Sequence, residues 1–181
     1  MRRQELAHVL RAACSIAEDR DVVVVGSQAI LGSYDEDDLP AIATMSSEAD
    51  VAFLRDAERK ALQVSGAIGE LSSFHETFDY YVDGVELELI ALPDGWEQRC
   101  VTWDLQSADP ARPRFVEPHD LAVAKLVAHR EKDRLFVSAL LDAGLIDHRT
   151  VVERARMLPE KYAGSVSSVT SWVESHRDHR K

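Results

Sequence analysis

The chain has 181 residues, of which 45% are hydrophobic, so it is long and apolar enough to bury a core and is not a disordered chain. With 21 Lys and Arg against 32 Asp and Glu, the formal net charge is −11 at pH 7, which opposes general binding to nucleic acid because phosphate contacts require a surplus of cations. The two cysteines fit no disulfide framework, and no apolar run is long enough for a signal peptide or a membrane span, so we expect a soluble, cytoplasmic protein with no membrane partner.

The first third of the chain alternates between helical and extended patterns. Apolar residues at helical spacing come first, then four consecutive valines, and later a short apolar stretch behind two acidic residues. The pattern predicts a helix, a buried strand, a polar loop, a second strand and a helix, at residues 6–17, 22–25, 33–47, 50–54 and 57–72. The valine strand runs directly into Gly26-Ser27, and a helical stretch follows at once.

Residues 80–91 are predicted to form a β-hairpin. Asp83-Gly84 supplies the residue types that a tight hairpin turn favours. Apolar and acidic residues alternate after the turn, which puts Glu86 and Glu88 on one face of the second strand. Two Glu residues on the wet face of a half-exposed hairpin are ordinary, but in an enzyme one of them would be a third carboxylate of the site.

The last third of the chain is predicted to be helical. After a proline-containing stretch with one short strand, a long helical pattern ends at Gly144, and Asp147 is suited to cap the next helix. The predicted strand and helices occupy residues 101–103, 119–143, 147–158 and 160–175. We therefore expect an α+β fold. A small mixed sheet flanked by helices in residues 1–114 would be followed by a C-terminal helical bundle, residues 115–181, packed on it as one compact unit.

Two features of the strands suit phosphate and metal binding. Gly26-Ser27 lies between a strand and a helix, where glycine lets backbone N–H groups approach a phosphate, although plain turn chemistry also explains such a dipeptide. Glu48 and Asp50 lie two residues apart on a strand, so their carboxylates point the same way and repel unless a cation sits between them. Mg²⁺ suits such a pair because it takes one or two carboxylates together with phosphate oxygens; an acidic strand edge in solvent is the alternative.

Positive charge is concentrated in residues 119–134, apart from the tail. Lys125 and Lys132 share one face of the predicted helix, and Arg130 and Arg134 add two further cations. This face is interpreted either as a phosphate-binding surface or as an ordinary solvated helix face. Lys125 stands within an apolar run, so its ammonium group must either reach water or meet a fixed anion.

Four segments of the chain are more specific together than any one of them alone. They are VVVVGSQAILGS at 22–33, SSEADVAF at 46–53, ELELIALPDGWEQR at 86–99 and EPHDLAVAKLVAHREKDRLFVSALL at 117–141. With them the chain resembles the polymerase-β-like nucleotidyltransferases, and within these the minimal nucleotidyltransferase toxins of the AbiEii/MenT type. The last segment is similar to that family's helical signature, an Asp-Leu-x-x-x-Lys followed by Arg-x-Lys-Asp.

The resemblance implies a role for each matching residue. The implied nucleotide-binding residues are Gly26, Ser27, Lys125, Arg130 and Lys132. The implied catalytic residues are Glu48, Asp50, Glu88, Lys125 and Asp133. Of these, Glu48, Asp50 and Glu88 would also bind the metal, Mg²⁺ or Mn²⁺.

The resemblance further implies an enzyme that adds nucleotides from a nucleoside triphosphate to an RNA acceptor, often the 3′ end of tRNA. Such an enzyme would be the toxin of a toxin–antitoxin pair and would be held off by an antitoxin protein. A second hypothesis is a catalytically weak or inactive binding protein that keeps the fold and acts through a protein partner. The long Glu side chains at positions 48 and 88 favour it, whereas convergence of Glu48, Asp50 and Glu88 on one cation would favour the enzyme.

Overall fold

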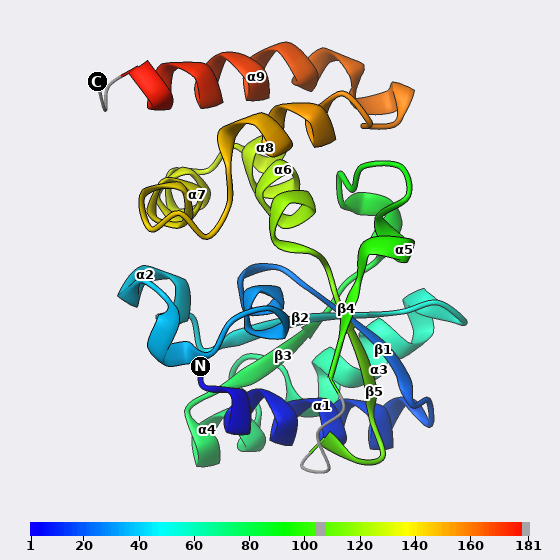
Figure 1. Ribbon diagram of the computed structural model, residues 1–181. Coiled ribbons are helices and arrows are strands. Elements are labelled where there is room, and N and C mark those ends of the chain that lie inside the picture. The colour runs from blue at the N-terminus through cyan, green and yellow to red at the C-terminus, as the bar shows by residue number, and fades with distance from the viewer. Residues whose placement is uncertain (104–107, 179–181) are drawn as a thin grey trace.

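The computed structural model describes residues 1–103 and 108–178 of the chain, and a five-stranded mixed sheet lies at its centre (Figure 1). The strands are β1 (Asp21–Val25), β2 (Glu48–Phe53), β3 (Tyr81–Gly84), β4 (Val101–Thr102) and β5 (Arg112–Phe115). They lie side by side in the order β3-β2-β1-β5-β4. Strand β1 pairs antiparallel with β2 and parallel with β5, whereas β2 pairs parallel with β3 and β4 antiparallel with β5.

Helices cover both faces of this sheet. They are α1 (Arg3–Ala17), α2 (Ala41–Thr44), α3 (Ala57–Ile68), α4 (Ser73–Phe78), α5 (Trp96–Arg99), α6 (Pro118–Ala128), α7 (Glu131–Asp142), α8 (His148–Ala155) and α9 (Ala163–Asp178). Short 3₁₀ turns η1 (Ser27–Gly32), η2 (Glu36–Asp38), η3 (Leu87–Leu89) and η5 (Glu160–Tyr162) join some of them. Figure 1 shows α1 and α3 beneath the sheet, α6 to α8 above it and α9 outermost. In the described part of the chain, no helix combines the length and the apolar character that a membrane crossing demands.

The valines of β1 anchor the core, as their pattern predicts. Val22, Val23, Val24 and Val25 are all buried, because β1 is a central strand with helices over both of its faces. The apolar face of α1 packs against one side of the sheet, and its polar face remains in solvent. The predicted α+β class is thus confirmed, with a mixed sheet flanked by helices and a helical C-terminal part. The exact division at residue 114 stays a prediction.

The predicted hairpin at residues 80–91 is wrong. Residues 81–84 form β3, which pairs parallel with β2, and the pairing ends where the N–H of Val85 donates to the carbonyl oxygen of Val51 at 2.8 Å. The chain then leaves the sheet and forms the turn η3. Gly84 is needed in the strand because α3 packs directly on it, and a Cβ atom there would lie 2.7 Å from the carbonyl carbon of Ala61. The Asp-Gly pair thus serves helix packing and not a turn.

The long helix predicted over residues 119–143 is broken in the structure. His129 adopts a left-handed conformation with φ 57° and ends α6, and α7 begins two residues later at a different angle (Figure 1). Lys125 and Lys132 therefore lie on two helices and not on one helical face. The break makes a corner that brings residues of α6 and α7 close together.

Strand β5 was not among the predicted elements. It contains Pro113, and proline counts against a central strand because it cannot donate a hydrogen bond to a neighbour. Strand β5 nevertheless lies between β1 and β4, with Pro113 in register with Val22. The strand leads directly into Glu117 and helix α6, so it positions the helix that carries Lys125.

Candidate active site

Three carboxylates converge at one edge of the sheet. Glu48 and Asp50 share a face of β2 because they lie two residues apart, and Asp83 of β3 lies in register with Asp50. One oxygen from each of the three lies within 4.8 Å of the other two. Among residues 1–103 and 108–178, this is the one group of three or more acidic, His or Cys side chains with such geometry. Oxygen donors at this spacing fit a hard divalent cation.

Asp83 supplies the third carboxylate, the role that the sequence-based prediction gave to Glu88. Glu88 is exposed in η3, outside the sheet, and the structure does not bring it to Glu48 and Asp50. Its placement on a strand depended on the hairpin, which is not formed. Asp83 instead accepts a hydrogen bond from Ser65 Oγ of α3 at 3.1 Å, which restrains the carboxylate at the edge of the sheet.

The electrostatics of the cluster favour a bound cation. Burial and the neighbouring negative charge of Glu48 raise the pKa of Asp50 to about 6, and Asp83 adds to this repulsion. Burial, together with Glu48, also raises the pKa of the Tyr81 hydroxyl to about 12, and that hydroxyl donates a 3.4 Å hydrogen bond to Glu48. A divalent cation among the three carboxylates would relieve the repulsion, so the donor set fits Mg²⁺ or Mn²⁺.

The turn after β1 brings the backbone against the carboxylates. Gly26 has φ 60° and ψ −163°, a conformation that is essentially restricted to glycine, and Ser27 then begins η1. A Cβ atom at position 26 would overlap the carboxylate of Asp50. Gly26 therefore lies directly beside Asp50. The triphosphate-binding role implied for Gly26 and Ser27 stays a prediction.

A buried cluster of charges links Ser27 to α6 and α7. Lys125 Nζ donates to Ser27 Oγ at 3.0 Å and to Asp133 Oδ1 at 3.1 Å. Arg130 donates two hydrogen bonds to the same carboxylate, from Nε at 2.6 Å and from a terminal nitrogen at 3.3 Å. Asp133 is fully buried, and only 7% of Lys125 is exposed, so Asp133 is the fixed anion that this lysine requires.

The opposite charges of Lys125, Arg130 and Asp133 keep these groups ionised. Burial lowers the pKa of Lys125 from its usual value, and the attraction of Asp133 and Asp50 opposes that effect. Burial would raise the pKa of Asp133, but the hydrogen bond from Arg130 and the charge of Lys125 hold it below its usual value. Two cations on one carboxylate leave a net positive charge that faces Asp50.

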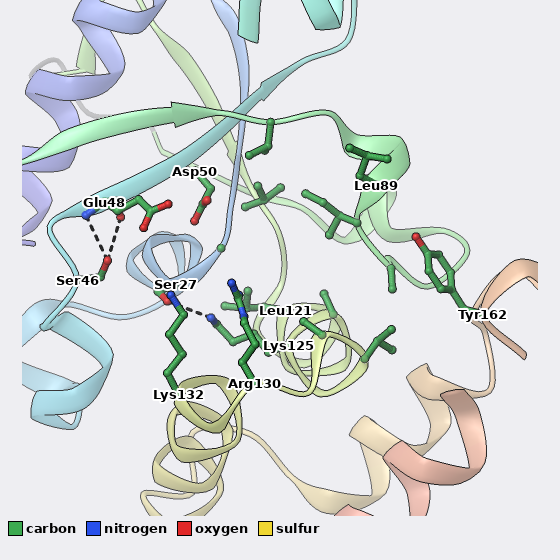
Figure 2. Close-up of a pocket in the computed structure, with 18 residues that line it drawn as sticks. Ser27, Ser46, Glu48, Asp50, Leu89, Leu121, Lys125, Arg130, Lys132 and Tyr162 are labelled. Carbon is green, nitrogen blue, oxygen red and sulfur yellow. Dashed lines mark hydrogen bonds between the residues drawn. The ribbon is translucent and has the colours of Figure 1, made fainter. Parts of the chain in front are cut away.

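A cavity of about 280 Å³ joins these groups (Figure 2). Its charged side chains are Glu48 and Asp50 on one wall and Lys125, Arg130 and Lys132 on the other. The volume is near the lower limit of sites that hold small molecules, about 300–1,000 Å³. The structure thus brings together every predicted site residue except Glu88, although Asp133 lies behind Lys125 and is not among the described residues that line the cavity.

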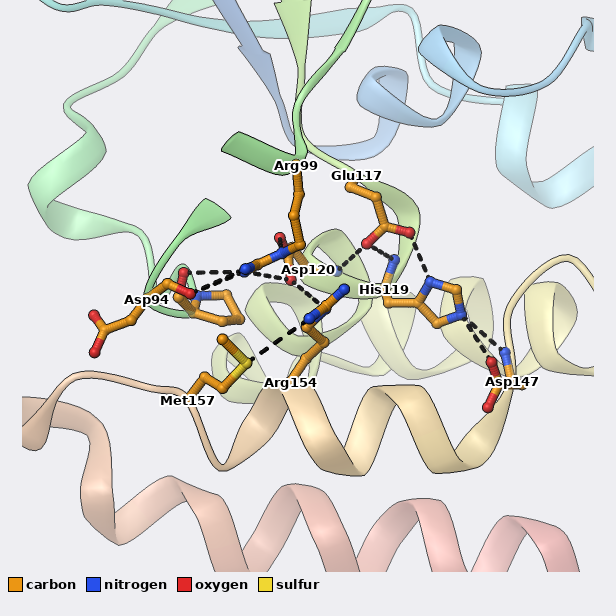
Figure 3. A network of polar contacts seen from close by, with 9 residues as sticks. Asp94, Arg99, Glu117, His119, Asp120, Asp147, Arg154 and Met157 are labelled. Carbon is orange, nitrogen blue, oxygen red and sulfur yellow. Dashed lines mark hydrogen bonds and ion pairs between the residues drawn. The ribbon is translucent and has the colours of Figure 1, made fainter. Parts of the chain in front are cut away.

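A second network holds α6 in place (Figure 3). Arg99 donates to both oxygens of the fully buried Asp120 at 2.8 and 3.1 Å, and Arg154 of α8 lies 3.4 Å from the same carboxylate. Glu117 caps α6 by accepting hydrogen bonds from the backbone N–H groups of His119 and Asp120. These contacts connect α5, α6 and α8, and they fix the helix on which Lys125 stands.

Sequence reasoning missed two residues of the site, Asp83 and Tyr162. Asp83 was assigned to a turn because Asp-Gly is a strong turn signal. The sequence does carry a signal for Asp83: it lies two residues after Tyr81, so on a strand both side chains point to one face. In the structure that is the face of the sheet that carries Glu48 and Asp50. Tyr162 lines the cavity from η5, 30 positions after Lys132, the lining residue nearest to it in the chain, and no local pattern marks it.

Comparison with protein families identifies the chain at a general level. Residues 4–173 match the family described as nucleotidyltransferase of unknown function (DUF6036). The chain belongs to this family. The match extends over the sheet and most of the helical part, including all the residues of the cavity. Comparison with curated proteins and with solved structures gives no match.

Membership of DUF6036 confirms the predicted nucleotidyltransferase family. It supports a general transferase activity and a nucleoside triphosphate as substrate.

Proposed function

We propose that the protein is a Mg²⁺-dependent nucleotidyltransferase that transfers a nucleotide from a nucleoside triphosphate to an acceptor hydroxyl. The observation that carries this proposal is the convergence of Glu48, Asp50 and Asp83. Two of these carboxylates, Glu48 and Asp50, line the cavity that Lys125 and Arg130 also line. Carboxylates for a cation and fixed positive charges for phosphates are the two parts that such a transfer requires. The convergence also supports the enzyme over the inactive binding protein, with Asp83 in place of Glu88.

The carboxylates and the turn after β1 have different proposed tasks. Glu48, Asp50 and Asp83 would hold Mg²⁺ or Mn²⁺, which when bound would neutralise phosphate charge and make an acceptor hydroxyl more acidic. In the reaction the acceptor oxygen forms a bond to the α-phosphorus, pyrophosphate leaves, and the hydroxyl proton passes to a carboxylate of the site. The backbone at Gly26-Ser27 would receive the triphosphate between the carboxylates and the cations.

The cations of α6 and α7 would stabilise charge on the triphosphate. Lys125 is already held in place by Ser27 and Asp133, so it loses little freedom when a phosphate arrives. Arg130 is anchored by Asp133 although its side chain is 61% exposed, and Lys132 is exposed too. Asp133 would act through Lys125 and Arg130 and not on the substrate, so we treat it as a positioning residue.

We propose RNA as the acceptor, with the 3′ end of tRNA first among the candidates. The resemblance to the AbiEii/MenT toxins supports this choice, and so does the positive group formed by the exposed Arg130 and Lys132, which line the cavity, together with the half-buried Arg134 of α7. Because the chain carries a net charge of −11, RNA should bind through this local group and with a shallow dependence on salt. A toxin of this kind would act in the cytoplasm and be held off by an antitoxin protein.

The direct test is incubation of the purified protein with each labelled nucleoside triphosphate and total RNA, with and without Mg²⁺. We expect label in RNA only when Mg²⁺ is present, and none with Asp50→Asn. That variant should fold normally and be as stable as the parent or more so, because it removes a buried carboxylate whose ionisation the site opposes. Undiminished labelling by Asp50→Asn would contradict the proposal, and labelling of protein instead of RNA would contradict the choice of acceptor.

A further inference from the structure

The cavity has a second end, away from the charged groups, that the transfer chemistry does not use. In Figure 2 the labelled residues Leu89 and Tyr162 lie on the opposite side from Glu48 and Asp50. This end is built from the segment that follows β3, from the last turn of α6 and from η5. Its lining residues are Val85, Leu89, Ile90, Val127, Ala128 and Tyr162.

The second end is apolar and open. Leu89 is 78% exposed although it lines a cavity, which leaves apolar surface in water that an occupant would cover. Among the described residues that line this end, Tyr162 alone has a polar side-chain atom, its hydroxyl. A flat apolar group would therefore gain from burial here, whereas side chains that could read a pattern of hydrogen-bond donors and acceptors are few.

The two walls of this end are tied together. Lys161 Nζ donates to the carbonyl oxygen of Glu88 at 2.6 Å, which joins η5 to η3. The same ammonium lies 4.9 Å from the centroid of the Tyr162 ring, within the range of a cation–π contact. The contacts hold Tyr162 and Leu89 at the mouth before any ligand arrives, so little ordering remains to be done on binding.

We propose that this apolar end binds the nucleobase of the triphosphate, with Tyr162 as its aromatic wall and Leu89 facing it. This inference rests on the proposed function, because the phosphates must lie among the cations for the base to reach Tyr162. The site selects by the area of the base and not by its hydrogen-bonding edge. Purine triphosphates therefore bind about fivefold more tightly than pyrimidine triphosphates, and ATP and GTP bind alike.

The experiment compares ATP, GTP, CTP, UTP and inorganic tripolyphosphate, each with Mg²⁺, by titration calorimetry on the full chain. We expect ATP and GTP to bind equally, CTP and UTP more weakly, and tripolyphosphate weakest. Equal affinity for ATP and tripolyphosphate would overturn the nucleobase site and leave the nucleotidyltransferase proposal intact. A preference of tenfold or more between ATP and GTP would overturn selection by area. Binding of none of these ligands would overturn both proposals.

Variants separate the base from the phosphates. Tyr162→Ala should lower ATP affinity about tenfold and leave tripolyphosphate affinity unchanged, whereas Tyr162→Phe should keep the parent's ATP affinity because the ring remains. Leu89→Ser tests the facing wall at an exposed position, so it avoids the risk that a change at Tyr162 unfolds η5. Leu71→Ser is the matched control, since Leu71 is 84% exposed and lies outside the cavity. Equal losses of ATP and tripolyphosphate affinity in Tyr162→Ala and in Leu89→Ser would overturn the proposal.

Discussion

Gly26 and Asp50 are in such close contact that a Cβ atom at position 26 would overlap Oδ2 of Asp50 and lie 2.6 Å from its Cγ. The glycine also has the positive φ of 60° that lets the chain turn from β1 into η1. One residue thus provides both the turn and the space for a carboxylate of the proposed metal site.

Gly26→Ala should therefore damage both the backbone conformation and the proposed metal site. We expect a loss of about 1–3 kcal/mol in the free energy of unfolding, since a side chain is strained in this conformation, and a loss of Mg²⁺ binding because Asp50 must move. Chemical denaturation and Mn²⁺ titration measure the two effects. The matched control is Gly66→Ala in α3, where a Cβ atom meets no described atom within 4 Å, so it should stabilise the helix by about 0.5–1 kcal/mol. Unchanged metal affinity in Gly26→Ala would contradict this account.

Asp83 and Glu88 distinguish the site seen in the structure from the site expected from the sequence. Asp83→Asn should reduce transfer by on the order of 10²-fold and weaken Mn²⁺ binding, because one of three converging carboxylates loses its charge. Glu88→Gln should retain the activity of the parent, since the Glu88 side chain is exposed on η3. Transfer rates at several metal concentrations provide the comparison. The reverse result, a defect in Glu88→Gln alone, would restore the sequence-based assignment.

Lys125→Met should reduce stability as well as activity. The substitution leaves the buried Asp133 with Arg130 as its remaining cation, and breaking a buried ion pair is costly, so we expect a loss of about 1–3 kcal/mol in the free energy of unfolding. Triphosphate affinity should fall, and transfer should drop on the order of 10²-fold.

Lys132→Met is the matched control for Lys125→Met. Lys132 lines the same cavity but is exposed, so its loss should leave stability unchanged and weaken triphosphate binding only a few-fold. Thermal melts and calorimetric titration with ATP give both quantities. If Lys125→Met kept full triphosphate affinity, the assignment of α6 to the active site would fail.

His119 makes the stability of the helical part depend on pH. Burial lowers the pKa of His119, but the hydrogen bond and charge of Glu117, with a further contribution from Asp147, outweigh this and raise it above its usual 6.5. The imidazolium therefore contributes stability that is fully present below pH 6.5 and is lost as the pH rises through the higher folded-state pKa. Relative to the parent, His119→Gln should lose stability at pH 6 and less at pH 8, as measured by urea denaturation. An equal loss at both values would show that His119 acts by packing alone.

Much of the site follows from neighbours in the chain. Residues two apart on a strand share a face whatever the rest of the protein does, so Glu48 and Asp50 were paired correctly from sequence. Four buried valines before a glycine likewise required a central strand and a sharp turn, and Gly26 is found there. The cap of α8 by Asp147, which accepts from the N–H of Thr150 at 2.8 Å, depends only on residues three apart.

Tertiary structure decided the rest, because the deciding contacts join distant segments. Asp83 reaches the other two carboxylates only because β3 pairs parallel with β2, and Asp-Gly alone carries a turn signal that this pairing overrides. Lys125 meets Ser27 across 98 positions of the chain, and it meets Asp133 because the chain breaks at His129, which a continuous helical pattern does not reveal. Tyr162 completes the cavity through the packing of the helical part on the sheet. Local sequence patterns determine which face of a strand or helix a side chain occupies. Which strands pair and where a helix breaks depend on the free energy of burying the whole core.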